Sequence, residues 1–165
     1  MDTNAISTLT EHVILKLDLQ PQGALRLFHG RGKCFPGLEH ITVDWLEGQV
    51  LVSLFKEPSS DELDTLNKEI ISWTTKSEWT TSAAQSLLLQ HRNRDRSPTE
   101  CLWGNYQEHQ IVSEEGLLFQ LDLGKNQNSG LFLDMRYGRR WVKENSQNKR
   151  VLNLFAYTCG FSVAA

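Results

Sequence analysis

The last stretch of the chain, RVLNLFAYTCGFSVAA from Arg150 to Ala165, holds the residues whose types and spacing suit chemistry best. An apolar run with strand character, residues 150–155, meets a short turn at residues 158–160, and residues 161–165 have the character of a helix start. In α/β proteins a strand, a glycine-containing turn and a helix N-terminus form a cradle, because backbone N–H groups there point at the bound ligand. The stretch therefore predicts a cofactor site.

Charge is spread unevenly along the chain. Residues 124–150 carry seven bases against two acids, and residues 57–69 carry five acids against one lysine. The formal net charge of the whole chain is only −3, so an anionic partner would be bound through a local basic patch. The alternative interpretation is that both stretches are solvated helix faces.

Composition limits the class of protein. With 165 residues, 39% of them hydrophobic and 22% charged, the chain is typical of a globular protein with one core, or of a small domain plus part of another. Its three cysteines are widely spaced and form no C-x-x-C pair, which argues against a disulfide framework and a structural zinc site. Residues 1–10 lack a signal-peptide pattern and no apolar run is long enough to span a membrane. We expect a cytoplasmic protein without a metal site.

Periodicity predicts the elements that must position the cradle. Strands are expected over four segments, residues 24–29, 40–46, 49–56 and 86–90, with a hairpin turn at residues 47–48. Ser59 and Glu62 have the spacing of a capping box, and apolar residues then recur on one helical face as far as Trp73. This pattern predicts a helix over residues 61–76, packed on the sheet.

The pattern of predicted secondary structure changes near residue 100. A hairpin is predicted over residues 110–123, followed by a basic helix over 135–145 with Asp134 as its N-cap, and then by a buried strand over 150–155. A helix that leads into a strand and then into another helix is the opening of a parallel α/β sheet. We therefore predict the α/β class, with a small α+β domain over residues 1–100 and the first part of an α/β domain over 101–165.

Two motifs carry a family resemblance. GLFLDMR (residues 130–136) and VLNLFAYTCGFSVAA (residues 151–165) resemble a bacterial family of S-adenosylmethionine-dependent methyltransferases that modify large-subunit ribosomal RNA at the five position of cytosine or the N7 of guanine. The upstream segments LRLFHGRGKCFPGLEHITVDW (25–45) and LLLQHRNRDRSPTECLWG (87–104) resemble the small domain that precedes the catalytic domain in this family. The resemblance implies a Rossmann-like class I domain, S-adenosylmethionine as cofactor and ribosomal RNA as substrate.

The resemblance also implies a set of cofactor contacts. They are Asn128, Gly130, Phe132, Asp134, Arg136, Asn153, Phe155, Ala156, Tyr157 and Gly160. Phe155 and Tyr157 would offer aromatic faces to the adenine or to the sulfonium cation. Arg136 would pair with the methionine carboxylate, and Gly160 would let the chain pass close to the ligand.

Several of these residues also have simpler interpretations. Asp134 would serve only as a helix cap, the arginines at 136, 139 and 140 would form a solvated helix face, and Phe155 and Phe161 would belong to a core. Cys159 departs from the family pattern, which usually has glycine there; a Cβ at this turn would crowd the cofactor or demand a different φ.

No catalytic residue is predicted within the chain. In the resembled family the acid that holds the ribose, the proline-rich motif that faces the base and the thiol used in cytosine methylation all follow the first cofactor motif. We therefore expect these 165 residues to be the N-terminal portion of a methyltransferase and catalytically incomplete alone.

Basic residues of the first hundred positions are candidates for RNA backbone contacts: Arg31, Lys33, Arg92, Arg94 and Arg96. Contacts of this kind would make binding salt-dependent. A stand-alone RNA- or protein-binding module with a remnant methyltransferase tail is the alternative function. The first-motif architecture also serves methyl transfer to proteins and small molecules, so the fold does not determine the acceptor.

Overall fold

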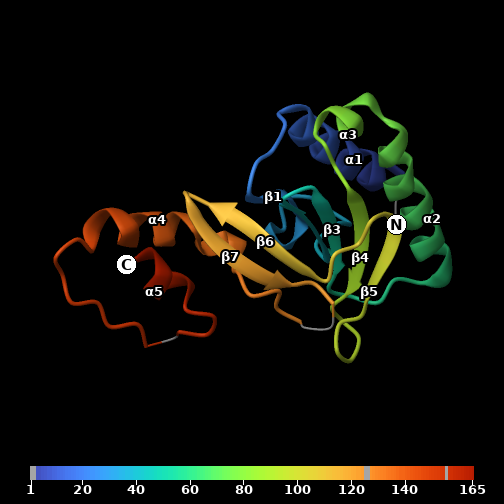
Figure 1. The fold of residues 1–165 in the computed structure, drawn as a ribbon. Helices are drawn as coiled ribbons and strands as arrows, with labels where there is room; N and C mark the ends of the chain where they lie inside the picture. Colours follow the sequence, from blue (N-terminus) through green and yellow to red (C-terminus); the bar gives the residue numbers. More distant parts are fainter. Residues whose placement is uncertain (1–2, 125–126, 155) are drawn as a thin grey trace.

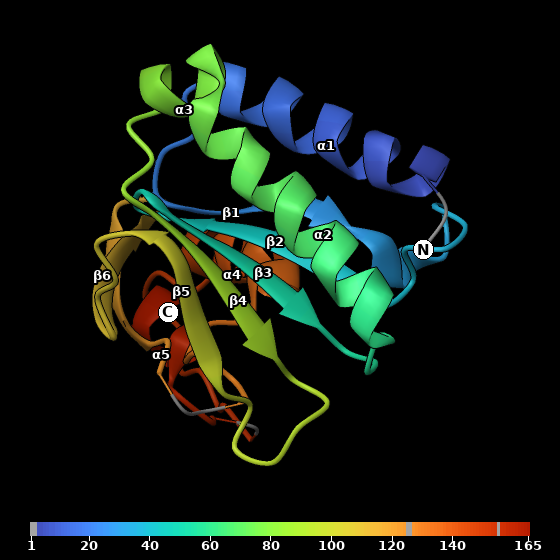
Figure 2. The ribbon, with the colours of Figure 1, turned by 90° about the vertical axis from the view of Figure 1, so that its right-hand side faces the viewer.

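The computed structural model describes residues 3–124, 127–154 and 156–165. Three helices cover one face of a five-stranded sheet, and a two-stranded hairpin followed by the C-terminal helices lies on the other side (Figures 1 and 2). The α/β class is confirmed. None of the described helices is long and apolar enough to cross a membrane.

The central sheet has the order β1-β2-β3-β4-β5. Its strands are β1 (Ala24–His29), β2 (Ile41–Leu46), β3 (Gln49–Leu54), β4 (Ser86–His91) and β5 (Thr99–Gly104). β3 and β4 pair in parallel, whereas the other neighbours are antiparallel. Every residue of β2, β3 and β4 is buried, because both faces of the sheet are covered. The predicted strands and the hairpin turn at residues 47–48 are confirmed.

Helix α2 (Ser60–Ser72) confirms the capping-box prediction. The Glu62 amide donates to Ser59 Oγ at 3.4 Å, and the Ser59 amide donates to Glu62 Oε2 at 3.0 Å. The Glu62 carboxylate accepts hydrogen bonds from the Ser59 amide and hydroxyl, and these hydrogen bonds help to lower its pKa below the usual value. A 3-10 turn (Trp73–Thr75) continues the helix, and Trp73 is fully buried against the sheet.

Helix α1 (Thr3–Asp18) was not predicted from the sequence. Its signal is present, since Leu9, Val13 and Leu17 follow helical spacing and are fully buried against the sheet. The short helix α3 (Ser77–Thr81) and strand β5 also lacked a prediction.

The predicted hairpin forms from β6 (His109–Glu114) and β7 (Leu117–Asp122). It packs on the helix-free face of the sheet, where Val112 and Leu121 join a second core with Leu51 and Leu88. Polar contacts add to the junction: the amide of Ser113 donates to a Glu47 carboxylate oxygen at 3.0 Å.

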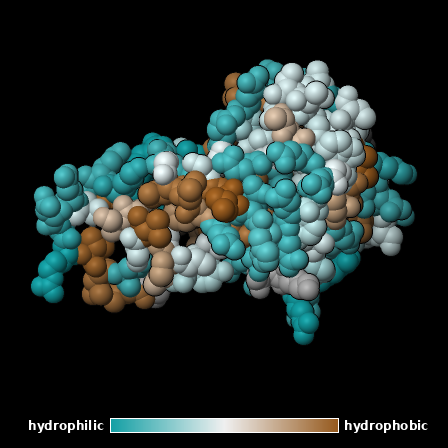
Figure 3. All heavy atoms as spheres, in the orientation of Figure 1, coloured by the Kyte–Doolittle hydropathy of each residue, from teal (hydrophilic) through white to brown (hydrophobic). Residues whose placement is uncertain are grey.

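The predicted buried strand over residues 150–155 is wrong for its described part. Residues 150–154 form no strand, and the side chains of Leu152 and Leu154 are 82% and 75% exposed. No strand of the described chain pairs with this segment, so its apolar side chains stay at the surface. Hydrophobic residues gather on the C-terminal part of the molecule, at the left of Figure 3. Phe155 lies outside the described residues.

The capping role predicted for Asp134 is also wrong. Helix α4 (Arg136–Asn145) has Met135 at its N-cap position with no side-chain capping bond, and Asp134 lies in a preceding 3-10 turn (Leu133–Met135). That turn moves the helix start two residues past the aspartate. The predicted helix start after residue 160 is confirmed as α5 (Gly160–Ala164).

Candidate functional site

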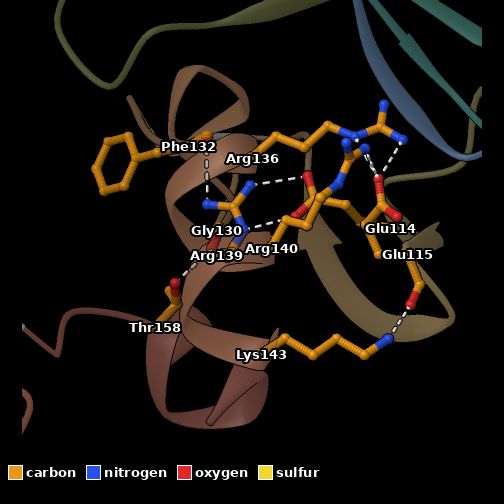
Figure 4. Close-up of polar contacts among 9 residues, drawn as sticks. All are labelled: Glu114, Glu115, Gly130, Phe132, Arg136, Arg139, Arg140, Lys143 and Thr158. Atoms are coloured by element: carbon orange, nitrogen blue, oxygen red, sulfur yellow. Dashed lines mark hydrogen bonds and ion pairs between the residues drawn. The ribbon is translucent and has the colours of Figure 1, made fainter. Parts of the chain in front are cut away.

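The tip of the β6–β7 hairpin holds helix α4 through a buried ion pair. Arg139 Nε and Nη2 donate to the two carboxylate oxygens of Glu114 at 2.6 and 2.8 Å, and both side chains are almost completely buried (Figure 4). A third donor, Arg139 Nη1, reaches the carbonyl oxygen of Phe132 at 2.8 Å. The interpretation of Arg139 as part of a solvated helix face is therefore wrong.

Glu115 binds the exposed side of the same helix. Its carboxylate accepts from Arg136 Nη2 at 3.1 Å and from Arg140, and its carbonyl oxygen accepts from Lys143 Nζ at 2.5 Å (Figure 4). Hydrogen bonds from Arg140 and Arg136 hold the pKa of Glu115 below its usual value. Arg136, which was predicted to pair with the methionine carboxylate of the cofactor, is thus already paired with the carboxylate of Glu115.

The turn after residue 155 is tied to the segment of the GLFLDMR motif. The Thr158 hydroxyl donates to the carbonyl oxygen of Gly130, and the Tyr157 hydroxyl donates to that of Asn128 at 3.4 Å. The rings of Tyr157 and Phe132 lie 5.3 Å apart between centroids, tilted by 43°. Four predicted cofactor residues from two separate motifs therefore come together.

A cavity of about 300 Å³ opens beside this cluster, lined by Asn128, Gly130, Tyr157 and Thr158 on one side and by strand β7 on the other. Phe132 and Tyr157 are 45% and 57% exposed; Tyr157 lines this cavity, whereas Phe132 lines a second cavity nearer the central sheet. Exposed aromatic faces beside a cavity suit a flat heterocycle and an organic cation, the two chemical features of S-adenosylmethionine.

The remaining predicted cofactor residues lie around this cluster. Gly160 faces the aliphatic part of Arg139, to which an added Cβ would lie at 3.6 Å. Asn153 donates from Nδ2 to Ser162 Oγ at 3.0 Å, and the Ala156 carbonyl accepts from the Cys159 amide at 2.5 Å. Asp134 lines a different cavity, nearer the central sheet.

Cys159 adopts the left-handed conformation, with φ of 61° and ψ of 19°. This conformation costs a residue with a Cβ about 1–2 kcal/mol and costs glycine almost nothing. The departure from the family's glycine therefore falls at a position where the backbone favours glycine.

The five candidate RNA-contacting residues do not form one patch. Arg31 and Arg92 lie over the ring of Phe55, with their guanidinium carbons 4.1 and 4.7 Å from its centroid. Arg94 instead pairs with Glu57 at 2.6 Å. A cavity is lined by Phe55, Arg31 and Arg92. Neither the exposed Lys33 nor Arg96, whose side chain is 84% exposed, lines it.

The pair Asp44–Arg26 was missed by the sequence reading. Arg26 Nε donates to the Asp44 carboxylate across the β1–β2 ladder, where the two residues face each other. Burial raises the pKa of Asp44 from 3.8 to about 6, and Arg26 only partly opposes the effect. Alternating patterns show which strand residues are apolar, but an opposing charge becomes visible only with the strand register.

Asp44 makes stability depend on pH in a defined direction. Because its pKa is higher in the folded state, its contribution is fully present below pH 3.8 and is lost as pH rises through about 6. At pH 7 the stability lost through ionisation of Asp44 is about 3 kcal/mol, relative to the chain with Asp44 protonated. Urea unfolding from pH 4 to pH 7 should show the Asp44→Asn variant gaining about 2–3 kcal/mol relative to the unsubstituted chain. A difference that stays constant with pH would contradict this assignment.

The three cysteines, Cys34, Cys101 and Cys159, are free and exposed. Among residues 3–124, 127–154 and 156–165 no group of three or more metal-ligating side chains comes together.

The family model described as S-adenosylmethionine-dependent methyltransferase matches residues 25–165. The ribosomal RNA large subunit methyltransferase K/L of Hahella chejuensis is 28% identical over 127 residues, covering 76% of this chain and 18% of that protein. A Bacillus subtilis protein assigned as a ribosomal RNA large subunit methyltransferase, YwbD, is 29% identical over 157 residues, covering 90% of this chain and 36% of that protein.

Among solved structures, SMU.776, assigned as a methyltransferase and complexed with SAH, superposes with a TM-score of 0.73 at 24% identity. The superposition covers 97% of this chain and 41% of that one, and at this identity it shows a shared fold. The chain spans about a fifth to two fifths of the length of these relatives.

Proposed function

The chain belongs to the family of S-adenosylmethionine-dependent methyltransferases, and we propose that it forms the N-terminal part of an enzyme that methylates large-subunit ribosomal RNA. The names of the two relatives support RNA as the acceptor. The division into a small domain over residues 1–100 and a methyltransferase portion over 101–165 remains our proposal for how the roles are separated. The three free cysteines and the ribosomal substrate support a cytoplasmic location.

One observation carries the cofactor assignment: the turn at residues 156–160 is bonded to residues 128–130 beside an open cavity. Phe132 and Tyr157 would hold the adenine ring or the sulfonium cation against their faces. Asn128 and Gly130 would line the wall that the cofactor contacts. When bound, S-adenosylmethionine supplies an electrophilic methyl group.

The other members of the predicted set have less support. Arg136 is engaged by Glu115, and Asn153 by Ser162, so a role in binding would require these contacts to exchange. Asp134 lines the cavity near the central sheet, and Gly160 faces the side chain of Arg139. Their direct contact with the cofactor stays a prediction, as does that of Ala156; Phe155, which lies outside the described residues, stays one too.

Calorimetric titration with S-adenosylmethionine tests the site. The Cys159→Gly variant should bind the cofactor at least as tightly as the unsubstituted chain, because glycine keeps the left-handed turn and removes the Cβ that would crowd the cofactor. Its free energy of unfolding should rise by about 0.5–1 kcal/mol, because the greater flexibility of glycine in the unfolded chain offsets part of the gain.

The matched control is Cys159→Ala, which removes the thiol but keeps the Cβ and should bind like the unsubstituted chain. Absence of binding by the folded Cys159→Gly variant would contradict the cofactor assignment. Transfer of a labelled methyl group from S-adenosylmethionine to large-subunit ribosomal RNA by the whole enzyme tests the acceptor. Transfer to protein or small molecules alone would contradict it.

A further inference from the structure

A second cavity, of about 270 Å³, lies between the central sheet and residues 127–134. Arg31, Phe55 and Arg92 form its wall on the side of the sheet, and Asn128 lies across from them. This wall comes from the first hundred residues and the facing segment comes from the methyltransferase portion. The cavity therefore lies where the two proposed parts meet.

The two arginines are held by an aromatic ring instead of by carboxylates. Both guanidinium carbons lie within 5 Å of the Phe55 centroid, at 4.1 and 4.7 Å. Arg92 Nη2 donates to Asn128 Oδ1 at 2.9 Å, whereas its buried Nε has no hydrogen-bond partner among the described residues. Within the same described part of the chain, Arg31 forms no ion pair. Stacking positions both guanidinium groups without pairing either of them with a carboxylate.

Nearby charges leave the cavity with an excess of positive charge. Arg26 also lines it but is paired with Asp44, and Asp134 supplies the second carboxylate. Three guanidinium groups thus face two carboxylates. Burial and the neighbouring Arg31 and Arg26 lower the pKa of Arg92, a sign that like charges are held close together there. Anionic oxygens with several lone pairs would satisfy these donors.

We propose that this cavity binds a phosphate group between Arg31 and Arg92, and that an RNA strand supplies it. The proposal deepens the proposed function, since RNA is the acceptor named there. It selects two of the five basic residues predicted from the sequence and excludes Lys33, Arg94 and Arg96. A phosphate at Arg92 would compete with Asn128 for the guanidinium, and the Asn128 carbonyl accepts from Tyr157. Binding of RNA would thereby change the contacts of Asn128, which is also part of the cofactor cluster.

Fluorescence anisotropy with a labelled 12-nucleotide single-stranded RNA, without cofactor, tests the proposal. Arg31→Gln and Arg92→Gln should each weaken binding about tenfold. Each should also lower the slope of log affinity against log salt by about 0.7. The matched control is Arg96→Gln, which removes the same charge from an exposed position on the neighbouring loop and should change affinity less than about twofold. Thermal unfolding confirms that each variant is folded, and the exposed Arg31 is the safer position.

Competition distinguishes the sources of the phosphate. Displacement of the RNA by millimolar inorganic phosphate in the unsubstituted chain, lost in Arg31→Gln, would show that a phosphate group alone suffices. Displacement only by unlabelled RNA would show that the strand is needed, and both results support the site. Equal weakening by Arg96→Gln and Arg31→Gln, or no binding of RNA and phosphate, would overturn it. The assay measures RNA binding and not methyl transfer. Its result can therefore be interpreted even if the enzyme does not methylate ribosomal RNA.

Discussion

Replacing Arg139 by methionine is expected to lower the free energy of unfolding by about 3–5 kcal/mol. The variant leaves the Glu114 carboxylate buried without its bidentate partner and removes the donor to the Phe132 carbonyl. Methionine fills a similar volume, so the loss reports charge and hydrogen bonding more than packing. Urea unfolding at pH 7 measures it.

The double variant Glu114→Leu with Arg139→Met is the control for this interpretation. Because it removes both charges together, it should recover most of the lost stability, as apolar replacements of buried ion pairs usually do. If the double variant is as unstable as Arg139→Met alone, the helix is held by something other than the ion pair. A loss below about 1 kcal/mol in the single variant would place the pair in solvent.

Replacing Gly23 by alanine is expected to cost about 2–5 kcal/mol, because two penalties add. The residue has φ of +71°, and a Cβ there would lie 2.2 Å from the backbone carbonyl oxygen of Ser113 in β6. The left-handed conformation accounts for about 1–2 kcal/mol, and forced separation of the two backbones for about 1–3 kcal/mol more. This contact joins the central sheet to the hairpin that holds α4.

Gly116 offers a matched control for the Gly23 substitution. Its φ is +79°, close to that of Gly23, but a Cβ there would meet nothing within 4 Å. Gly116→Ala should therefore cost only the conformational part, about 1 kcal/mol. Equal losses in the two variants would show that the close approach to Ser113 has no energetic effect.

Elements with local signals were predictable from the sequence. The hairpin turns at residues 47–48 and 115–116 have positive φ at both positions, as Glu-Gly turns between strands require. The capping box of α2 also depends on residues only three positions apart. By contrast, the strand expected over residues 150–155 needs neighbouring strands to pair with, and apolar character alone could not supply them.

The candidate site divides in the same way. The motif resemblance predicted Asn128, Gly130, Phe132 and Tyr157 as cofactor contacts, and the structure brings these four residues together. It did not find that Glu114 and Glu115 bind the basic helix, because those contacts join residues more than twenty positions apart. Charge patterns show that a helix is basic, but only the tertiary fold shows which of its arginines are already paired.

The parallel pairing of β3 with β4 has a consequence for the order of folding. Strands β2 and β3 meet across a two-residue turn, whereas β4 reaches β3 only after the chain has passed through α2 and α3. Closing that long connection costs entropy before its contacts are formed. The β2–β3 hairpin is therefore the expected nucleus, and docking of α2, with Leu66 and Ile70 on its buried face, is the step that sets the folding rate.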